Sequence, residues 1–216
     1  MDIKAVIFDM DGTLLDTMGS FADYAAKLIE KNYNIKFNKA RSLYFNTSGL
    51  PFRHQLEQIF PKHRSNQKVA NQFEKWKKGN IKNMHKLRDG ALETIQKLLD
   101  KGLIVCVSSN NSQENVDCIV KQWKIGIGAA LGYRYNGFGK GNAHFKWIGE
   151  KFNIRRPEMI FVADSLNDYR ISHDAGVYFA AFAATFKEED FKKLNQNIPC
   201  FSDFAGINKW ILSHIC

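Results

Sequence analysis

The sequence predicts a doubly wound, Rossmann-like α/β fold with a parallel sheet and a block of helices inserted after the first strand. Short apolar runs alternate with segments of helical periodicity, which is typical of right-handed β-α-β crossovers. Several of these runs end in polar residues, and ligands of such sheets bind beyond the carboxyl ends of the strands. The ends of the predicted strands are therefore where functional residues are sought.

The first predicted strand, at residues 5–8, runs directly into Asp9 and then Asp11. Two carboxylates at this spacing can point at one spot, where their mutual repulsion is costly without a cation between them. A hard metal ion such as Mg²⁺ suits one or two carboxylates. The alternative is a plain turn in which Asp11 and Gly12 are turn residues.

The second part of the chain, residues 17–86, is predicted to be all helical. Its first helix spans 21–31, with Ser20 as the N-cap. Further helical segments, separated by glycine- and proline-containing stretches, are expected at 39–45, 52–60 and 66–78. The predicted domains are therefore a core of residues 1–16 and 87–216 and a helical insertion of residues 17–86.

From residue 89 onward the alternation of helices and strands resumes. The predicted helices are 91–101, 113–124, 142–152, a helix from about 168 to 175, 188–194 and 207–214. The predicted strands are 103–107, 127–131, 159–163, 177–183 and 199–201.

Polar residues follow three of the predicted strands directly. Asp9 and Asp11 follow the first, Ser108 follows the strand at 103–107, and Asp164 and Asp168 follow the strand at 159–163. Because parallel strands end at one edge of the sheet, these side chains are expected to converge. Independent turn residues would have to fall at each of these places by coincidence.

Composition narrows the class of protein. The 216 residues are 44% hydrophobic and 25% charged, as in ordinary soluble globular proteins. No apolar run is long enough for a transmembrane helix, and no basic region precedes an apolar one at the N-terminus, so neither a membrane partner nor a signal peptide is expected. The four cysteines lack C-x-x-C spacing, which favours a reducing, cytoplasmic setting.

The net charge of +9 raises the question of nucleic-acid binding. The lysines are dispersed, apart from a cluster between residues 73 and 88, and no nucleic-acid-binding motif accompanies them. We interpret the cluster as a solvated helix face and expect no nucleic-acid partner. An excess of positive charge can also attract an anionic substrate.

The motifs together resemble those of the haloacid dehalogenase-like hydrolase superfamily. The resemblance rests on D-M-D-G-T at residues 9–13, Ser108, Lys140 and A-D-S-L-N-D at residues 163–168, which occur in the family's order along the whole chain. The helical block resembles the cap of phosphoglycolate phosphatase-like and β-phosphoglucomutase-like members. The resemblance implies a capped Rossmann-like core.

The resemblance also implies roles for the carboxylates. Asp9 would be the nucleophile that forms an aspartyl-phosphate, and Asp11 the general acid and base. Mg²⁺ would be held by Asp9, the Asp11 backbone carbonyl and Asp164, with Asp168 acting directly or through water. The family's dehalogenases lack the second carboxylate, so the presence of Asp11 favours phosphoryl transfer.

The remaining candidates would bind phosphate or the leaving group. Ser108 and the adjacent Ser109 suit a phosphate oxygen, although Ser108 could equally be a helix N-cap. Lys140 matches the family's lysine, but the usual K-P-x-P continuation is absent and Lys146 is a competitor. In the turn at 48–53, Arg53 could grip an anionic group of the substrate or be an exposed arginine at a helix start.

Two further sets of side chains are expected to be structural. The histidines show no metal-ligand spacing and are expected at the surface: His54, His63, His85 and His144. Three aromatic residues are expected in the core of the helical block rather than at a substrate: Tyr44, Phe73 and Trp76.

The sequence thus predicts a Mg²⁺-dependent phosphatase acting on a small phosphorylated metabolite. Three alternatives remain open: a phosphomutase of the β-phosphoglucomutase type, a phosphonatase that uses a cap lysine, and a non-catalytic scaffold. The substrate and the oligomeric state are not determined by the sequence.

Overall fold

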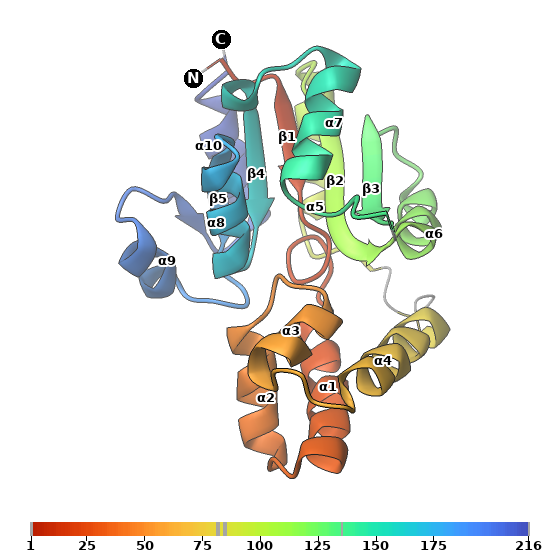
Figure 1. The fold of residues 1–216 in the computed structure, drawn as a ribbon. Helices are drawn as coiled ribbons and strands as arrows, with labels where there is room; N and C mark the ends of the chain where they lie inside the picture. Colours follow the sequence, from red (N-terminus) through yellow and green to blue (C-terminus); the bar gives the residue numbers. More distant parts are fainter. Residues whose placement is uncertain (1, 81–82, 84–85, 135, 216) are drawn as a thin grey trace.

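A computed structural model describes residues 2–80, 83, 86–134 and 136–215, and the core of the protein is a parallel sheet (Figure 1). Its six strands are arranged in the order β3-β2-β1-β4-β5-β6. The strands are β1 (Ala5–Phe8), β2 (Ile104–Ser112), β3 (Ala129–Tyr133), β4 (Met159–Ala163), β5 (Tyr178–Phe182) and β6 (Cys200–Phe201). The predicted doubly wound α/β fold is confirmed.

Helices cover both faces of the sheet because the central strands β1 and β4 are apolar throughout. In β1, Val6 and Phe8 face one layer, whereas Ala5 and Ile7 face the other. The first layer contains α5 (Ala91–Asp100), α6 (Gln113–Trp123) and α10 (Phe204–Leu212). The second contains α7 (Asn142–Phe152), α8 (Leu166–Asp174) and α9 (Glu188–Leu194), and a 3₁₀ turn, η2 (Arg156–Glu158), precedes β4.

The helices that follow β1 form a separate body at the carboxyl ends of the strands (Figure 1). They are α1 (Met18–Tyr33), α2 (Phe37–Asn46), α3 (Phe52–Ile59) and α4 (Asn66–Asn80). They share a hydrophobic cluster of their own, in which Phe73 packs 4.3 Å from Phe52 and 5.9 Å from Phe21 between ring centroids. Tyr44 belongs to this cluster and Trp76 packs against it, as expected, but Tyr44 and Phe73 also line the pocket described below, so the prediction that they lie away from a ligand site is wrong for these two. Among the described helices, none has the length and apolar character needed to cross a membrane.

Several elements begin or end a few residues from their predicted limits, and two of these differences have a clear physical cause. Helix α1 begins at Met18 with Thr17 as its N-cap, so the prediction that Ser20 caps this helix is wrong. The reason is that the buried Met18 extends the apolar face of the helix towards its N-terminus. Strand β2 runs beyond Val107 to Ser112, because its polar end still pairs with β3, with Ser108 opposite Leu131 and Ser112 opposite Tyr133.

Candidate active site

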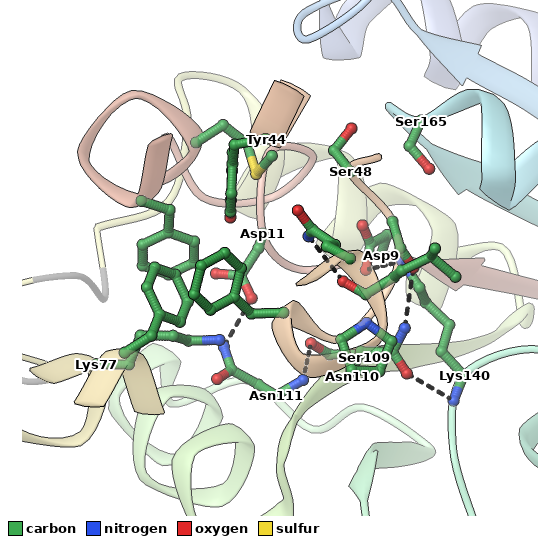
Figure 2. A pocket seen from close by; sticks show the side chains of 18 of the residues that line it. Asp9, Asp11, Tyr44, Ser48, Lys77, Ser109, Asn110, Asn111, Lys140 and Ser165 are labelled. Atoms are coloured by element: carbon green, nitrogen blue, oxygen red, sulfur yellow. Dashed lines mark hydrogen bonds and ion pairs between the residues drawn. The ribbon is translucent and has the colours of Figure 1, made fainter. Parts of the chain in front are cut away.

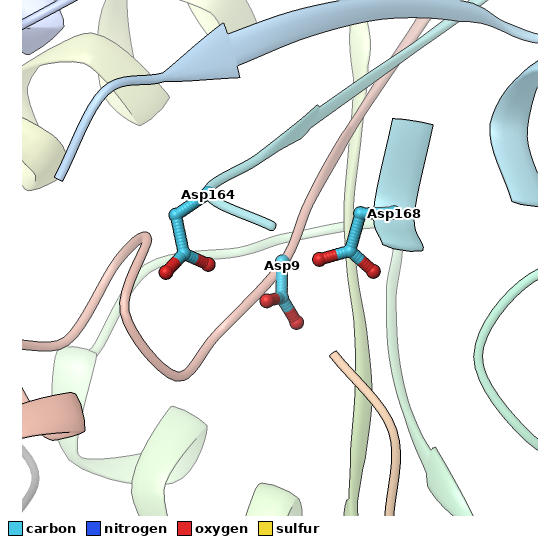
Figure 3. A group of neighbouring side chains, drawn as sticks. All are labelled: Asp9, Asp164 and Asp168. Carbon is cyan, nitrogen blue, oxygen red and sulfur yellow. The ribbon is translucent and has the colours of Figure 1, made fainter. Parts of the chain in front are cut away.

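Three buried aspartates meet at the carboxyl end of the sheet (Figure 3). Asp9 follows β1 and Asp164 follows the neighbouring β4, and the Asp9 amide donates to the Val162 carbonyl at 2.9 Å. Asp168 lies in the first turn of α8. One carboxylate oxygen from each aspartate lies within 4.8 Å of those of the other two. The pairing of β1 with β4 therefore brings together aspartates that are distant in the sequence.

The buried carboxylates repel one another, and a nearby positive charge stabilises their ionised forms. Burial raises the pKa of Asp9 well above its usual range, and Asp168 and Asp164 raise it further, although Lys140 lowers it. Burial likewise raises the pKa of Asp164 to about 6. A divalent cation would relieve this repulsion, and a cluster of oxygen ligands suits Mg²⁺. The residues present therefore fit a hard metal ion.

Lys140 is the cation already within the cluster. Its Nζ lies 2.7 Å from Asp168 Oδ1 and 3.2 Å from Asp9 Oδ1, and its side chain is 4% exposed. Burial lowers the pKa of Lys140, but Asp168 and Asp9 raise it by more, so the ammonium stays charged. Lys146 instead lies on the exposed face of α7, with Nζ 3.8 Å from Glu150 Oε1. The structure thus places Lys140, and not Lys146, in the site.

Asp168 and Asp164 have further partners that hold them in place. Asp168 Oδ2 accepts a hydrogen bond from Ser165 Oγ at 2.6 Å, so both oxygens of Asp168 are engaged. Asp164 accepts from Thr13 Oγ1 at 3.1 Å and from Thr185 Oγ1. Thr185 was not predicted from the sequence as a site residue. The feature that could have indicated it is its position just beyond the end of β5.

Asp11 points into the pocket apart from the other three carboxylates. Its Oδ1 accepts from Thr17 Oγ1 at 2.9 Å and its Oδ2 from Asn111 Nδ2 at 2.6 Å. The chain turns at Gly12, whose φ is +86° and where a Cβ would overlap the Asp164 carboxylate. Asp11 is thus part of a turn, as the alternative interpretation held, and also lines the pocket.

The two serines at the end of β2 have different surroundings. Ser109 lines the pocket, as do Asn110 and Asn111. Ser108 lies outside it, with Oγ 2.8 Å from His144 Nδ1, because successive side chains of a strand point to opposite faces. The prediction of Ser108 as a phosphate-binding side chain is therefore corrected, and Ser109 remains the candidate.

His144 is also placed differently from its prediction. It is fully buried on α7, and the Phe138 ring lies 4.6 Å from it between centroids. Burial lowers the pKa of His144 to about 4, so the imidazole is neutral at physiological pH. The prediction of a surface position is wrong, whereas His54 and His63 are exposed as expected. His85 lies outside the described residues.

The helical body closes the pocket from the side opposite the sheet (Figure 2). The pocket remains partly open to solvent, and its cavity volume is about 60 Å³. The residues that α1 to α4 and their connections contribute to its wall include Phe21, Tyr44, Ser48, Gly49, Gln55 and Lys77. Arg53 is exposed and does not line the pocket, because Phe52 and Gln55 occupy the inner face of α3. The prediction of a substrate contact from Arg53 is corrected accordingly.

The turn before α3 is docked directly onto the core. The Gly49 carbonyl accepts from Asn110 Nδ2 at 3.0 Å and from Asn167 Nδ2 at 3.5 Å. Gly49 has a φ of +87°, and a Cβ at this position would overlap Ser165 Oγ. A side chain at residue 49 is therefore incompatible with this closed arrangement.

Replacing Gly49 with alanine is expected to lower kcat/KM by roughly 10- to 100-fold, because the turn can no longer approach Ser165 and the reacting groups are misplaced. Steady-state kinetics would measure the loss. Gly19→Ala, on α1 where a Cβ meets nothing within 4 Å, is the matched control. Equal kinetics for the two variants would show that closure at Gly49 is not required.

Comparison with known proteins supports a family assignment. The sequence profile of the haloacid dehalogenase-like hydrolase family matches residues 6–182. No curated protein matches the sequence.

Solved structures share the fold over nearly the whole chain. A predicted phosphatase from Clostridium acetobutylicum superposes with a TM-score of 0.82 at 19% identity, covering 99% of this chain and 100% of its own. A predicted phosphoglycolate phosphatase from Haemophilus somnus gives 0.71 at 22% identity, covering 98% and 99%. A hydrolase from Pseudomonas syringae gives 0.81 at 12% identity, covering 98% of each chain. With the family profile matched across both the sheet and the inserted helices, the chain belongs to the haloacid dehalogenase-like hydrolase family.

Proposed function

We propose that this hydrolase is a Mg²⁺-dependent phosphatase that acts on a small phosphomonoester through an aspartyl-phosphate on Asp9. The observation that carries the proposal is a pocket in which Asp9, Asp11 and Lys140 face a common space beside two further buried aspartates. A second carboxylate next to the nucleophile serves a leaving group that needs a proton, as an alkoxide does.

In the proposed reaction, an Asp9 carboxylate oxygen attacks phosphorus while the bond to the leaving oxygen breaks. Asp11 donates its proton to that oxygen, and in the second half-reaction takes a proton from the water that attacks the aspartyl-phosphate. The hydrogen bonds from Thr17 and Asn111 hold the Asp11 carboxyl in place for both steps. Lys140 and Ser109 bind phosphate oxygens, and the positive charge of Lys140 offsets the charge of the phosphoryl group.

The metal would be held by Asp9, Asp164 and the backbone carbonyl of Asp11. When bound, Mg²⁺ neutralises charge between the carboxylate nucleophile and the phosphate. Asp168, with one oxygen on Lys140 and the other on Ser165, acts on the site by positioning Lys140. Any contribution of Asp168 to the metal would pass through water.

Residues 17–86 act in this proposal as a cap on a core formed by residues 1–16 and 87–216. Closure of the cap excludes water and strengthens electrostatic interactions around the phosphate. The cap also supplies the walls that the leaving group meets. A small metabolite in a cytoplasmic setting is the expected substrate, with no role for nucleic acid or a membrane.

One alternative gains support from a specific residue. Phosphonate hydrolysis in this family uses a cap lysine, and Lys77 of α4 is a buried cap lysine that lines the pocket. Phosphonoacetaldehyde therefore belongs in any substrate panel. Its hydrolysis in preference to phosphomonoesters would favour this second function.

Hydrolysis of p-nitrophenyl phosphate, with Mg²⁺ and after its removal by a chelator, tests the proposal. Turnover is expected with the metal and should be lost without it. Measuring the release of inorganic phosphate from a panel of phosphorylated metabolites would then identify the leaving group. If neither the nitrophenyl ester nor any member of the panel is hydrolysed with metal present, the protein is not a phosphatase.

A further inference from the structure

Lys140 lies between Gly139 and Gly141, so the backbone on either side of it has few intrinsic restraints. Gly141 has a φ of +103°. Proline cannot adopt this conformation, because its ring holds φ at about −65°. Residue 141 is therefore incompatible with the proline of the K-P-x-P pattern in this backbone. The Lys140 ammonium must nevertheless reach both Asp9 and Asp168, so contacts with other elements have to hold its segment in place.

A buried hydrogen bond holds this segment one helical turn beyond Lys140. His144 lies in the first turn of α7, with Nδ1 2.8 Å from Ser108 Oγ, and both residues are completely buried. The imidazole also packs against Phe138, with the ring centroids 4.6 Å apart. Since Phe138 comes before Lys140 in the chain and His144 comes after it, the imidazole touches both flanks of the lysine.

The bonded pair joins the two elements that carry the proposed phosphate-binding side chains. Neither Ser108 nor His144 lines the pocket, whereas Ser109 and Lys140 do (Figure 2). Ser108 directly precedes Ser109 at the end of β2, and His144 follows Lys140 at the start of α7. Any movement of α7 along β2 would change the distance between Ser109 and Lys140, and it would also break the bond between Ser108 and His144.

A polar pair specifies this packing more strictly than an apolar contact would. A buried hydroxyl or imidazole has lost its hydrogen bonds to water, so displacement that leaves it unpaired is costly. Burial lowers the pKa of His144 to about 4, so the imidazole is neutral at physiological pH. The bond therefore fixes α7 without placing a second positive charge beside Lys140.

We propose that His144 is a positioning residue, which through its bond to Ser108 fixes the start of α7 on β2 so that Lys140 and Ser109 meet the same phosphoryl group. The effect on phosphate rests on the proposed phosphatase function, whereas the effect on the position of Lys140 does not. The proposal gives a role in the site to two residues that lie outside the pocket.

Chemical labelling of the metal-free protein measures the position of Lys140 without any activity. Acetic anhydride should acetylate the buried, ion-paired Lys140 far more slowly than the exposed Lys146, as read by peptide mass. In His144→Leu, the rate at Lys140 relative to that at Lys146 should rise roughly 2- to 10-fold, as expected for the loss of one hydrogen bond. His144→Asn, whose amide can place a polar atom near the position of Nδ1, should remain close to the wild type. Unchanged protection of Lys140 in His144→Leu would overturn the proposal.

Thr94→Val is the matched control for a loss of stability. Thr94 Oγ1 donates to the Phe204 carbonyl at 3.2 Å, which is also a buried bond between two elements, but in the helical layer on the other face of the sheet. Thermal melts would compare the stability of this variant with that of His144→Leu. The control should leave labelling of Lys140 unchanged. An equal rise in both variants would show that the Ser108–His144 bond contributes only to stability, and would also overturn the proposal.

Ser108→Ala tests whether the two residues act as a unit. This variant and His144→Leu should each raise the labelling of Lys140, and the double variant should raise it no further than the larger single effect. Independent, additive effects would show that His144 does not act through Ser108.

Calorimetric titration with inorganic phosphate in the presence of Mg²⁺ measures the consequence for the ligand. The affinity should fall roughly 2- to 10-fold in His144→Leu and be kept in His144→Asn and Thr94→Val. Equal phosphate affinity in the wild type and His144→Leu would overturn the positioning role while leaving the phosphatase proposal intact. If the wild type neither binds phosphate nor hydrolyses its esters, the phosphatase proposal fails, and labelling of Lys140 alone decides whether His144 positions it.

Discussion

Asp9→Asn is expected to lower kcat by at least about 10³-fold, since removal of a nucleophile leaves only positioning and electrostatic effects. The amide cannot attack phosphorus, whereas its shape preserves the surroundings of Asp9. The loss should appear in kcat on p-nitrophenyl phosphate with saturating Mg²⁺. Asp100→Asn, which changes an exposed aspartate at the end of α5, is the control and should retain activity.

Two further measurements separate loss of chemistry from loss of folding. Because burial and neighbouring carboxylates raise the pKa of Asp9, its charge is costly in the metal-free protein, and Asp9→Asn should melt at or above the wild-type temperature without Mg²⁺. Borohydride reduction of an acyl phosphate in the wild type should convert residue 9 to homoserine, detectable by peptide mass. Conversion of a different aspartate to homoserine, or full activity of Asp9→Asn, would refute the assignment of Asp9 as nucleophile.

Lys140→Met should be damaging to both activity and stability. Its ammonium bridges Asp9 and Asp168 in a buried setting, so its loss leaves two carboxylates without their counter-charge. Removing one partner of a buried ion pair costs about 3–5 kcal/mol. Urea denaturation of the metal-free protein should therefore show a lower free energy of unfolding, and kcat/KM should fall by at least about 10²-fold through lost phosphate stabilisation.

Lys146→Met provides the matched comparison six residues along the chain. Its side chain is 69% exposed and its contact with Glu150 is a surface pair, which typically contributes about 0–1 kcal/mol. Neither kcat/KM nor the unfolding midpoint should change appreciably. Similar losses in the two variants, or a larger loss in Lys146→Met, would show that Lys140 is not the cation of the site.

The sequence predicted most elements because their local signals agree with the tertiary structure. The strand at 159–163 and the helices at 142–152 and 188–194 have the predicted limits. The end of β2 could not be predicted, because its polar residues continue the strand only through pairing with β3. The start of α1 depended on the burial of Met18, which is likewise a tertiary property.

The candidate site, like the fold, could be predicted from the sequence only in part. Carboxylates directly beyond apolar strands are visible in the sequence, and the parallel sheet places Asp9 and Asp164 side by side through the pairing of β1 with β4. The sequence favoured Lys140 over Lys146, which lies inside the helix, and only the tertiary packing decided between them. No comparable sequence pattern indicates the contacts of Thr185 and Asn111, because these contacts depend on how the turn after β5 and the end of β2 are placed beside distant parts of the chain.

By itself, the sequence determined the α/β class, the helical insertion and the aspartates at the strand ends, since apolar periodicity and strand termination are local properties. Only the tertiary structure decided which side chains face the pocket. Strand alternation turns Ser108 towards His144 and leaves Ser109 in the pocket, and the packing of α3 and α4 exposes Arg53 while burying Lys77. The direction of a side chain depends on its neighbours in space, and those neighbours are defined only once the cap has packed against the sheet.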